Sequence, residues 1–91
     1  MSTESYRYDA SFFDYTTQGS LHSARRIVPV VRSVVPVASV LDVGCAQGAW
    51  LSVWRDAGAE VTGLDGDYVD RTRMLIDPSR FTAHDLAQPF A

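Results

Sequence analysis

The sequence predicts an α/β fold: the first half of a doubly wound parallel sheet, preceded by an N-terminal helical segment. Between residues 38 and 83, short apolar runs of strand length alternate with one helical stretch, which is the order typical of parallel sheets. A turn with glycines at positions 44 and 48 joins the first strand to that helix. We therefore divide the chain into a helical segment, 1–37, and a half-domain, 38–91. Right-handed crossovers in the half-domain predict the strand order 3-2-1.

Composition and charge restrict the possible partners. The 91 residues carry a net charge of −3 and are 46% hydrophobic, as expected for one small globular domain. No apolar run approaches the roughly 18 residues of a membrane span, and the first residues lack the apolar stretch of a signal peptide. We therefore expect a cytoplasmic protein without a membrane contact. The basic residues are eight scattered arginines, which argues against a nucleic-acid partner, and one cysteine, Cys45, is too few for a zinc site.

The N-terminal segment is predicted to contain two helices. Residues 10–18 form the first, which ends at Gly19. Ser20 is the predicted N-cap of the second helix, 21–35. Apolar side chains recur along this second helix at the spacing of one buried stripe: Leu21, Ala24, Val28, Val31 and Val35.

Two prolines affect the second helix. Pro29 lies well inside it, where proline removes an amide donor and crowds the preceding turn, so we expect a kink at residues 25–29. An extended segment, 27–37, is the alternative, although the two prolines within it exclude a central strand. Pro36 ends the helix in either interpretation.

Three strands and one helix are expected after residue 37. The first strand, 38–43, is a short apolar run of the kind that a buried parallel strand shows. The following helix, 49–57, stops at Gly58. Its inward face is predicted to hold Trp50, Val53, Trp54 and Ala57. The second and third strands, 60–64 and 81–83, are separated by a polar loop.

The glycine turn has the features of a ligand-binding loop. Gly44 and Gly48 allow the backbone to approach a ligand closely. The helix that follows begins with free amides at the positive end of its dipole. The alternative is a tight strand-to-helix turn that binds nothing.

Acidic residues lie at the carboxyl ends of the three predicted strands. Asp42 precedes the glycine turn, where its charge suits a cationic ligand. Asp65 lies about 20 residues beyond the turn, where dinucleotide folds hold the ribose hydroxyls. Asp85 follows the third strand. Because such strand ends line one crevice, we expect the three carboxylates there; ordinary turn or capping roles for Asp65 and Asp85 are the alternative.

These motifs together resemble those of class I S-adenosylmethionine-dependent methyltransferases. The glycine motif of that family is similar to four positions here: Asp42, Gly44, Ala46 and Gly48. Three wider stretches also look like a bacterial group of small methyltransferase-domain proteins: 8–15, 63–68 and 85–90. The resemblance therefore covers nearly the whole chain.

The resemblance implies a Rossmann-like three-layer sandwich, of which this chain carries the N-terminal half, and S-adenosyl-L-methionine as the cofactor. Asp65 would bind the ribose, Asp85 the exocyclic amine of adenine, and backbone amides near Leu86 the ring nitrogens. The cofactor-binding residues expected on this basis are Asp42, Gly44, Cys45, Ala46, Gly48, Asp65, Gly66, Asp85 and Leu86. S-adenosylhomocysteine is the second expected ligand, and the methyl acceptor is not predicted.

Two departures from the family pattern bear on function. Ala46 replaces the middle glycine of the motif. The family sheet has seven strands, whereas this sequence stops at Ala91, before a fourth strand. No catalytic residue can therefore be carried over, and we expect the 91-residue chain by itself to transfer no methyl group.

Two other functions stay open. A nicotinamide or flavin dinucleotide binder needs glycine at the first, third and sixth places of its fingerprint, where this chain has Gly44, Ala46 and Ala49. A non-catalytic fragment, split half or interaction module would differ from the enzyme in the sequence beyond Ala91. Since no fourth strand is present to pair with the first, we also expect self-association or a completing partner at the edge of residues 39–43.

Overall fold

The computed structural model describes residues 10–85, with side chains from residue 15 onward. In chain order its elements are α2 (Ala10–Val34), β1 (Ser39–Val43), α3 (Ala49–Asp56), β2 (Glu60–Asp65), the 3-10 turns η1 (Arg71–Arg73) and η2 (Pro78–Arg80), and β3 (Phe81–Ala83). Within residues 10–85, no helix is both long and apolar enough to cross a membrane.

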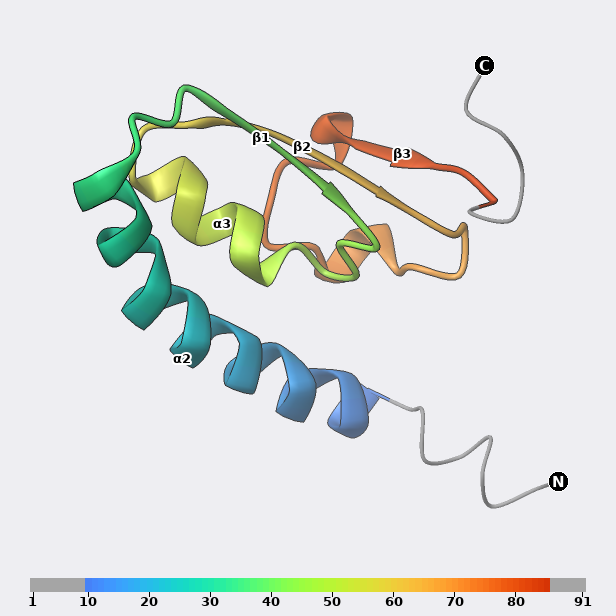
Figure 1. Cartoon of the computed structure of the whole chain (residues 1–91). Helices are drawn as coiled ribbons and strands as arrows, with labels where there is room; N and C mark the ends of the chain where they lie inside the picture. The colour runs from blue at the N-terminus through green and yellow to red at the C-terminus, as the bar shows by residue number, and fades with distance from the viewer. Residues whose placement is uncertain (1–9, 86–91) are drawn as a thin grey trace, which may run out of the picture.

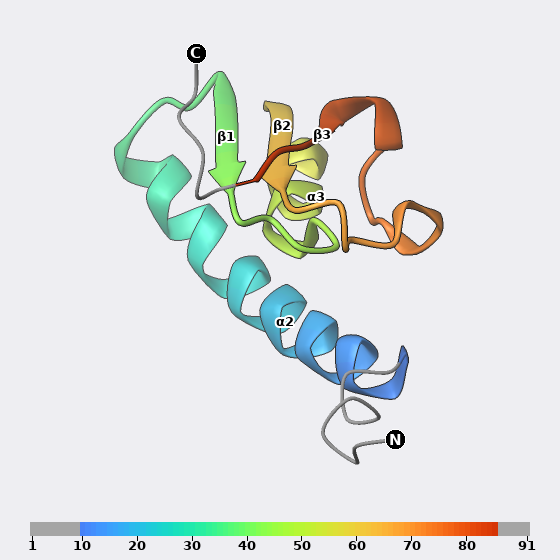
Figure 2. The ribbon, with the colours of Figure 1, turned by 90° about the vertical axis from the view of Figure 1, so that its right-hand side faces the viewer.

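The three strands form one parallel sheet in the order β1-β2-β3 (Figure 1). Val40 is opposite Val61 in the first pair of strands, and Gly63 is opposite Phe81 in the second. Helix α3 lies on one face of the sheet, and α2 packs against α3 (Figures 1 and 2). The result is a mixed α/β arrangement in which the carboxyl ends of all three strands lie at the same edge.

The core lies between α3 and the sheet. Its buried members are Cys45, Leu51, Val61, Val69, Ile76 and Phe81. Val69 and Ile76 belong to the segment between β2 and β3, which therefore folds back to close the core instead of extending into solvent. Cys45 belongs to the glycine turn, so the turn is packed into the same core.

The predicted inward face of α3 is partly wrong: Trp54 packs against the core, but the fully buried side chain is that of Leu51, which the predicted face did not include. Leu51 and Ser52 are buried, whereas Trp50, Val53 and Trp54 are only partly buried. The reason is that α3 packs on two sides, against the sheet and against α2. A single stripe at helical spacing does not describe a helix that is covered on two sides.

Residues 10–34 form one continuous helix, α2, which corrects the predicted break at Gly19 and the N-cap at Ser20. Glycine inside a helix costs about 1 kcal/mol relative to alanine. Burial of Leu21, Ala24 and Val28 on the face of α2 that packs against α3 offsets that cost.

Helix α2 also continues through Pro29, so the alternative of an extended segment at 27–37 is wrong. Pro29 cannot donate to the carbonyl of Arg25. Both residues are exposed, so water can bind that carbonyl. The kink expected at 25–29 stays a prediction. The helix ends just before Pro36, as expected, after the amide of Val35 donates to the carbonyl of Val31 at 2.9 Å.

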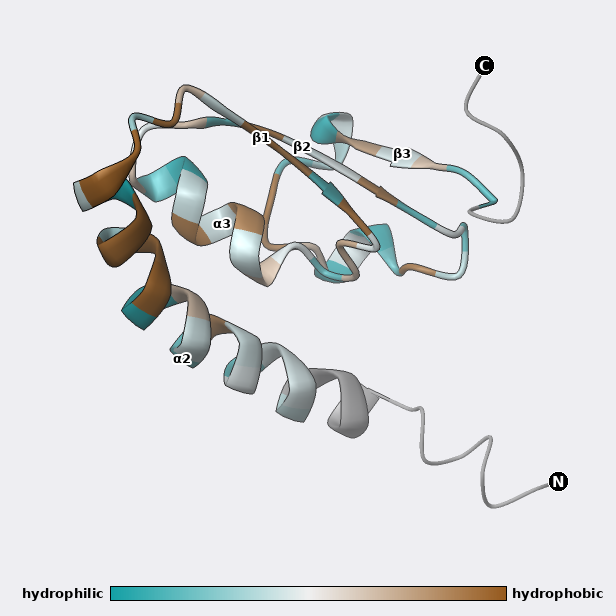
Figure 3. Cartoon of the chain, in the orientation of Figure 1, coloured by the Kyte–Doolittle hydropathy of each residue, from teal (hydrophilic) through white to brown (hydrophobic). Residues whose placement is uncertain are grey.

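The expectation that β1 is a buried strand is also wrong. Its residues alternate between exposed and partly buried, because no α-helix of the described part lies on the second face of the sheet (Figure 1). Leu41 and Val43 point to that face and are 60% and 52% exposed. Apolar residues also cover the last turns of α2, as Figure 3 shows: Ile27, Val30, Val34 and Val35 are exposed there.

We expect this surface to make the chain self-associate. Among the described residues β1 pairs only with β2, so the other edge of β1 offers free amides and carbonyls beside exposed apolar side chains. Sedimentation velocity across concentration should show mass above that of the monomer. Leu41→Lys should shift the distribution toward monomer.

Thr82→Lys is the control, because Thr82 is exposed on the same face of the sheet but on β3. A wild-type chain that stays monomeric at every concentration would contradict this expectation. Equal shifts toward monomer in Leu41→Lys and Thr82→Lys would also contradict it, because the added charge alone would then explain the change.

Candidate functional site

Backbone amides bind the glycine turn to the end of β2. The amides of Gly44 and Cys45 both donate to the carbonyl of Leu64, at 2.7 and 3.1 Å. The next amide, that of Ala46, donates to Oδ2 of Asp65 at 2.8 Å. Consecutive residues of the turn are therefore held at the carboxyl end of β2, immediately before α3.

The turn uses left-handed backbone conformations at Gly44, Ala46 and Gly48, with φ of 84°, 50° and 85°. For a residue with a side chain this conformation costs about 1–2 kcal/mol, and Ala46 bears that cost. A Cβ at Gly48 would also lie 3.2 Å from Cγ1 of Ile76. Gly48 is therefore required both by its φ and by the close approach of Ile76.

Gly63, in the middle of β2, also shapes the site, and the sequence analysis did not single it out. A Cβ there would lie 2.6 Å from Sγ of Cys45 and 3.0 Å from Cδ1 of Leu51. The absence of a side chain lets the turn and α3 pack directly on the strand. A lone glycine inside a predicted strand is the signal that could have indicated this close approach.

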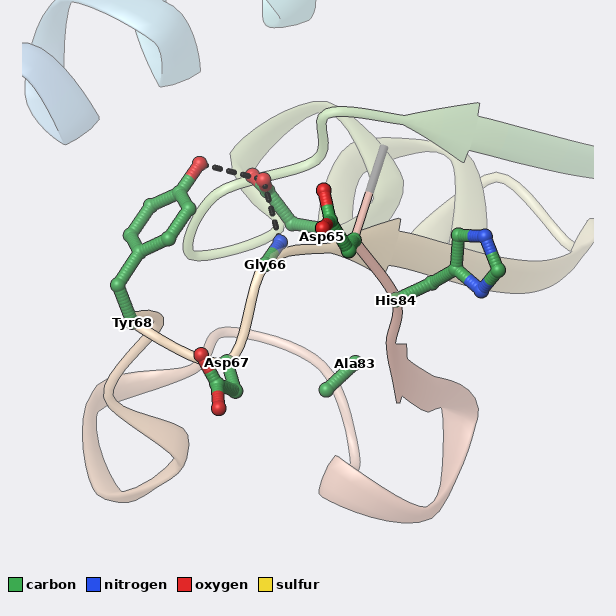
Figure 4. Close-up of a pocket in the computed structure, with 7 residues that line it drawn as sticks. Asp65, Gly66, Asp67, Tyr68, Ala83 and His84 are labelled. Carbon is green, nitrogen blue, oxygen red and sulfur yellow. Dashed lines mark hydrogen bonds between the residues drawn. The ribbon is translucent and has the colours of Figure 1, made fainter. Parts of the chain in front are cut away.

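The carboxylate of Asp65 is the most highly connected polar group of the site. It is only 2% exposed. Oδ2 accepts the amide of Ala46, and Oδ1 accepts both the amide of Gly66, at 2.8 Å, and the hydroxyl of Tyr68 (Figure 4). Its backbone carbonyl accepts the amide of His84 at 2.8 Å. Asp65 therefore joins the glycine turn, the loop after β2 and the end of β3.

The acidic residues also determine the protonation of their neighbours. Partial burial, and then the charge of Asp65, raise the pKa of Asp42. Burial raises the pKa of the Cys45 thiol to about 11, with the charges of Asp42 and Asp65 adding to the effect. Cys45 is therefore a neutral thiol near pH 7 and serves as a packing residue, because the nucleophilic form of cysteine is the thiolate.

Two cavities lie beside the hydrogen bond between the amide of Ala46 and the carboxylate of Asp65. The first, of about 590 Å³, is lined by Asp65, Gly66, Asp67, Tyr68, Ala83, His84 and Asp85. The second, of about 390 Å³, is lined by Thr16, Thr17, Ser20, Asp42, Gly44, Cys45, Ala46, Gln47, Ala49 and Trp50. Asp65 lines the first cavity and Ala46 lines the second. A single elongated ligand could therefore occupy both cavities.

The second cavity meets the start of α3. Gly48 caps this helix without a side-chain hydrogen bond, and the first amides of a helix have no partner within it. Ala49 and Trp50, the first two residues of α3, line the cavity. Gln47 lines the same cavity, and among the described residues its buried Oε1 has no hydrogen-bond partner. A buried acceptor of this kind is suited to a donor group on a ligand.

The structure brings all but one of the expected cofactor-binding residues to these cavities or to the turn between them. The exception is Leu86, which lies outside the described residues. The sequence analysis missed Gln47 and Tyr68. Helix α2 lines the second cavity through Thr16, Thr17 and Ser20. In the described part of the chain, no group of three His, Cys, Asp or Glu side chains could hold a metal ion.

Reaction of Cys45 with iodoacetamide tests the electrostatics of the site. A thiol with a pKa of about 11 holds, at pH 8, on the order of a hundredfold less thiolate than one at the usual 9.0. The alkylation rate should therefore keep rising with pH beyond 10. Asp42→Asn removes a nearby charge, lowers the pKa of Cys45 and should speed the reaction at pH 8, whereas Asp67→Asn should not. A rate that levels off near pH 9 would disprove the raised pKa.

Two glycine-to-alanine variants should change stability in opposite directions. Gly48→Ala places a side chain at positive φ and against Ile76, so it should lower the free energy of unfolding by about 1–2 kcal/mol. In Gly19→Ala the new methyl group meets nothing within 4 Å, and the helix should gain about 0.5–1 kcal/mol. Urea denaturation followed by circular dichroism measures both. Equal effects would show that the turn does not depend on Gly48.

Comparison with known proteins gives one short match. A segment of 28 residues is 68% identical to malonyl-[acyl-carrier protein] O-methyltransferase of Pseudescherichia vulneris, and covers 31% of this chain and 11% of that relative. No family model matches, and no solved structure matches significantly. The match supports a methyltransferase at the level of the family.

Proposed function

We propose that this chain binds S-adenosyl-L-methionine as the cofactor-binding half of a class I methyltransferase. The observation that carries the proposal is the position of Asp65. Its buried carboxylate lies at the end of β2, bonded to the glycine turn, between two cavities. A carboxylate in this position can accept hydrogen bonds from the two hydroxyls of a ribose.

The first cavity is suited to the adenosine part of the cofactor. Asp65 would accept the ribose hydroxyls, and the Asp85 carboxylate, which lines the same cavity, would accept the amine of adenine. Asp85 is exposed, so a ligand in this cavity can reach its side chain. The contact of the ring nitrogens with backbone amides near Leu86 is part of the same proposal, and Leu86 lies outside the described residues.

The second cavity is suited to the methionine part. The free amides at the start of α3 are donors for a carboxylate. The unpartnered Oε1 of Gln47 and the carboxylate of Asp42 are acceptors for an ammonium group. Donors and acceptors for both ends of an amino acid therefore line one cavity, which supports the fit of this cofactor.

The charge of the site favours S-adenosylmethionine over a dinucleotide. Three aspartates line the first cavity, Asp65, Asp67 and Asp85, and a fourth, Asp42, lines the second. These negative charges repel a diphosphate and attract a sulfonium or ammonium ion. A dinucleotide, whose two phosphates would lie near the glycine turn, is therefore the poorer ligand.

The bound cofactor would supply a methyl group on a positively charged sulfur, ready for attack by a nucleophile. The residues of this chain would bind and orient it, which is the main contribution of protein to such a transfer. The described residues do not identify a base or an acceptor. The acyl-carrier-protein substrate in the name of the relative is not assigned to this chain, because the match covers 11% of that enzyme.

Isothermal calorimetry with S-adenosylhomocysteine and NAD tests the proposal. We expect S-adenosylhomocysteine to bind more tightly than NAD. Asp65→Ala should weaken its binding by more than tenfold, because a charged hydrogen-bond acceptor is removed. Asp85→Asn should weaken it about threefold to tenfold. This second variant guards against misfolding, since Asp85 is exposed and Asp65 is buried.

Asp67→Ala is the control, because it removes a carboxylate from the same cavity without touching the hydrogen bonds of Asp65. Circular dichroism should be unchanged for it and for Asp85→Asn. Tighter binding of NAD, or equal losses in the Asp85 and Asp67 variants, would contradict the proposed mode of binding.

A further inference from the structure

The side chain of Tyr68 folds back over the loop after β2, and its hydroxyl binds the carboxylate of Asp65. Its hydroxyl donates to Oδ1 of Asp65, as Figure 4 shows. Its ring lies against the Cα of Gly66, so closely that a Cβ on Gly66 would be 2.6 Å from Cδ1 of Tyr68. Tyr68 is nevertheless 72% exposed. The ring is therefore held by this contact more than by burial.

The hydroxyl of Tyr68 occupies the position that a ligand hydroxyl needs. A carboxylate oxygen offers two lone pairs, and Oδ1 already accepts from both Gly66 and Tyr68. The other oxygen, Oδ2, accepts from Ala46. The two backbone amides belong to the fixed turn and strand end. Of these three donors, Tyr68 alone is on a side chain that can leave.

We propose that Tyr68 is an internal competitor at Oδ1 of Asp65, whose hydroxyl must be displaced before a ligand hydroxyl can bind that oxygen. The inference rests on the proposed function for the identity of that ligand. At Oδ1, a ligand with one hydroxyl and few other contacts only exchanges one hydrogen bond for another. An adenosyl ligand offers two hydroxyls together with contacts in both cavities, and so displaces Tyr68 with a net gain. Tyr68 thus sets the selectivity of the site.

The surroundings of Tyr68 are consistent with this role. The ring can swing outward cheaply, because most of its surface is already in water. The hydrogen bond to Asp65 is the largest cause of a raised pKa for Tyr68, with smaller contributions from desolvation and from the charges of Asp65 and Cys45. The hydroxyl therefore keeps its proton at neutral pH and remains a donor.

The affinity of Tyr68→Phe for S-adenosylhomocysteine tests the competition. The variant keeps the ring and removes the hydroxyl. Apparent affinity is the intrinsic affinity multiplied by the fraction of open sites, so we expect the variant to bind about threefold to tenfold more tightly. Tyr15→Phe, the same change at a tyrosine that is 80% exposed and lines neither cavity, should stay within about twofold of the wild type. Unchanged or weaker binding by Tyr68→Phe would overturn the inference.

A second measurement examines the contact without any ligand. Tyrosine labelled with ¹³C at Cζ reports the pKa of each ring by NMR, and Tyr68→Phe identifies the signal of Tyr68. We expect a pKa above the usual 10.0 in the wild type. It should fall toward the usual value in Gly66→Ala, where the new methyl group pushes the ring off Asp65. An ordinary pKa for Tyr68 in the wild type would overturn the inference.

The two measurements separate this inference from the proposed function. If S-adenosylhomocysteine binds and Tyr68→Phe does not bind it more tightly, the competition is wrong and the proposed function stands. If neither chain binds it, the proposed function is wrong, and the competitor role fails with it, whatever the pKa of Tyr68.

Discussion

The carboxylate of Asp65 is the group on which the architecture of this end of the molecule depends. It is nearly inaccessible to water, and such a charge is tolerated only where hydrogen bonds replace the lost hydration. Three donors do so: the amides of Ala46 and Gly66 and the hydroxyl of Tyr68. Hydrogen bonds to a charged group are worth about 1.5–3 kcal/mol each. The position of the glycine turn and that of the loop after β2 are therefore linked through one side chain.

The same region is held from its other side by the segment between β2 and β3. The amide of Leu75 donates to the carbonyl of Gln47 at 2.8 Å, and Nη1 of Arg55 donates to the carbonyl of Leu75 at 2.7 Å. Ile76 fills the space above Gly48. The glycine turn therefore lies between a strand and a packed loop, and these contacts order its backbone without a ligand. Such preorganisation lowers the entropic cost of binding.

Several residues around the glycine turn adopt conformations or environments that lower the stability of the fold. Ala46 adopts a left-handed conformation that costs free energy, Asp42 has a raised pKa because it is partly buried beside Asp65, and Gln47 buries an acceptor without a partner in the described part of the chain. Residues that bear such costs are concentrated at functional sites. In contrast, the contacts between α2 and α3 are ordinary apolar packing. The three residues that bear these costs thus all line the second cavity.

The sequence by itself determined the order of strand, turn, helix and strand, and the acidic residues at the strand ends, because periodicity and glycine placement are local properties. It predicted Asp65 and the glycine turn as parts of one site for the same reason. Only the tertiary structure decided that α2 continues through Gly19, that Leu51 of α3 is buried in the core, and that β1 has an open face. These outcomes depend on which surfaces pack together, and packing energies exceed local propensities of about 1 kcal/mol. The contact of Tyr68 with Asp65 could not be predicted from the sequence either, and nor could the close approach of Cys45 to Gly63. Each contact depends on how a loop folds back in space.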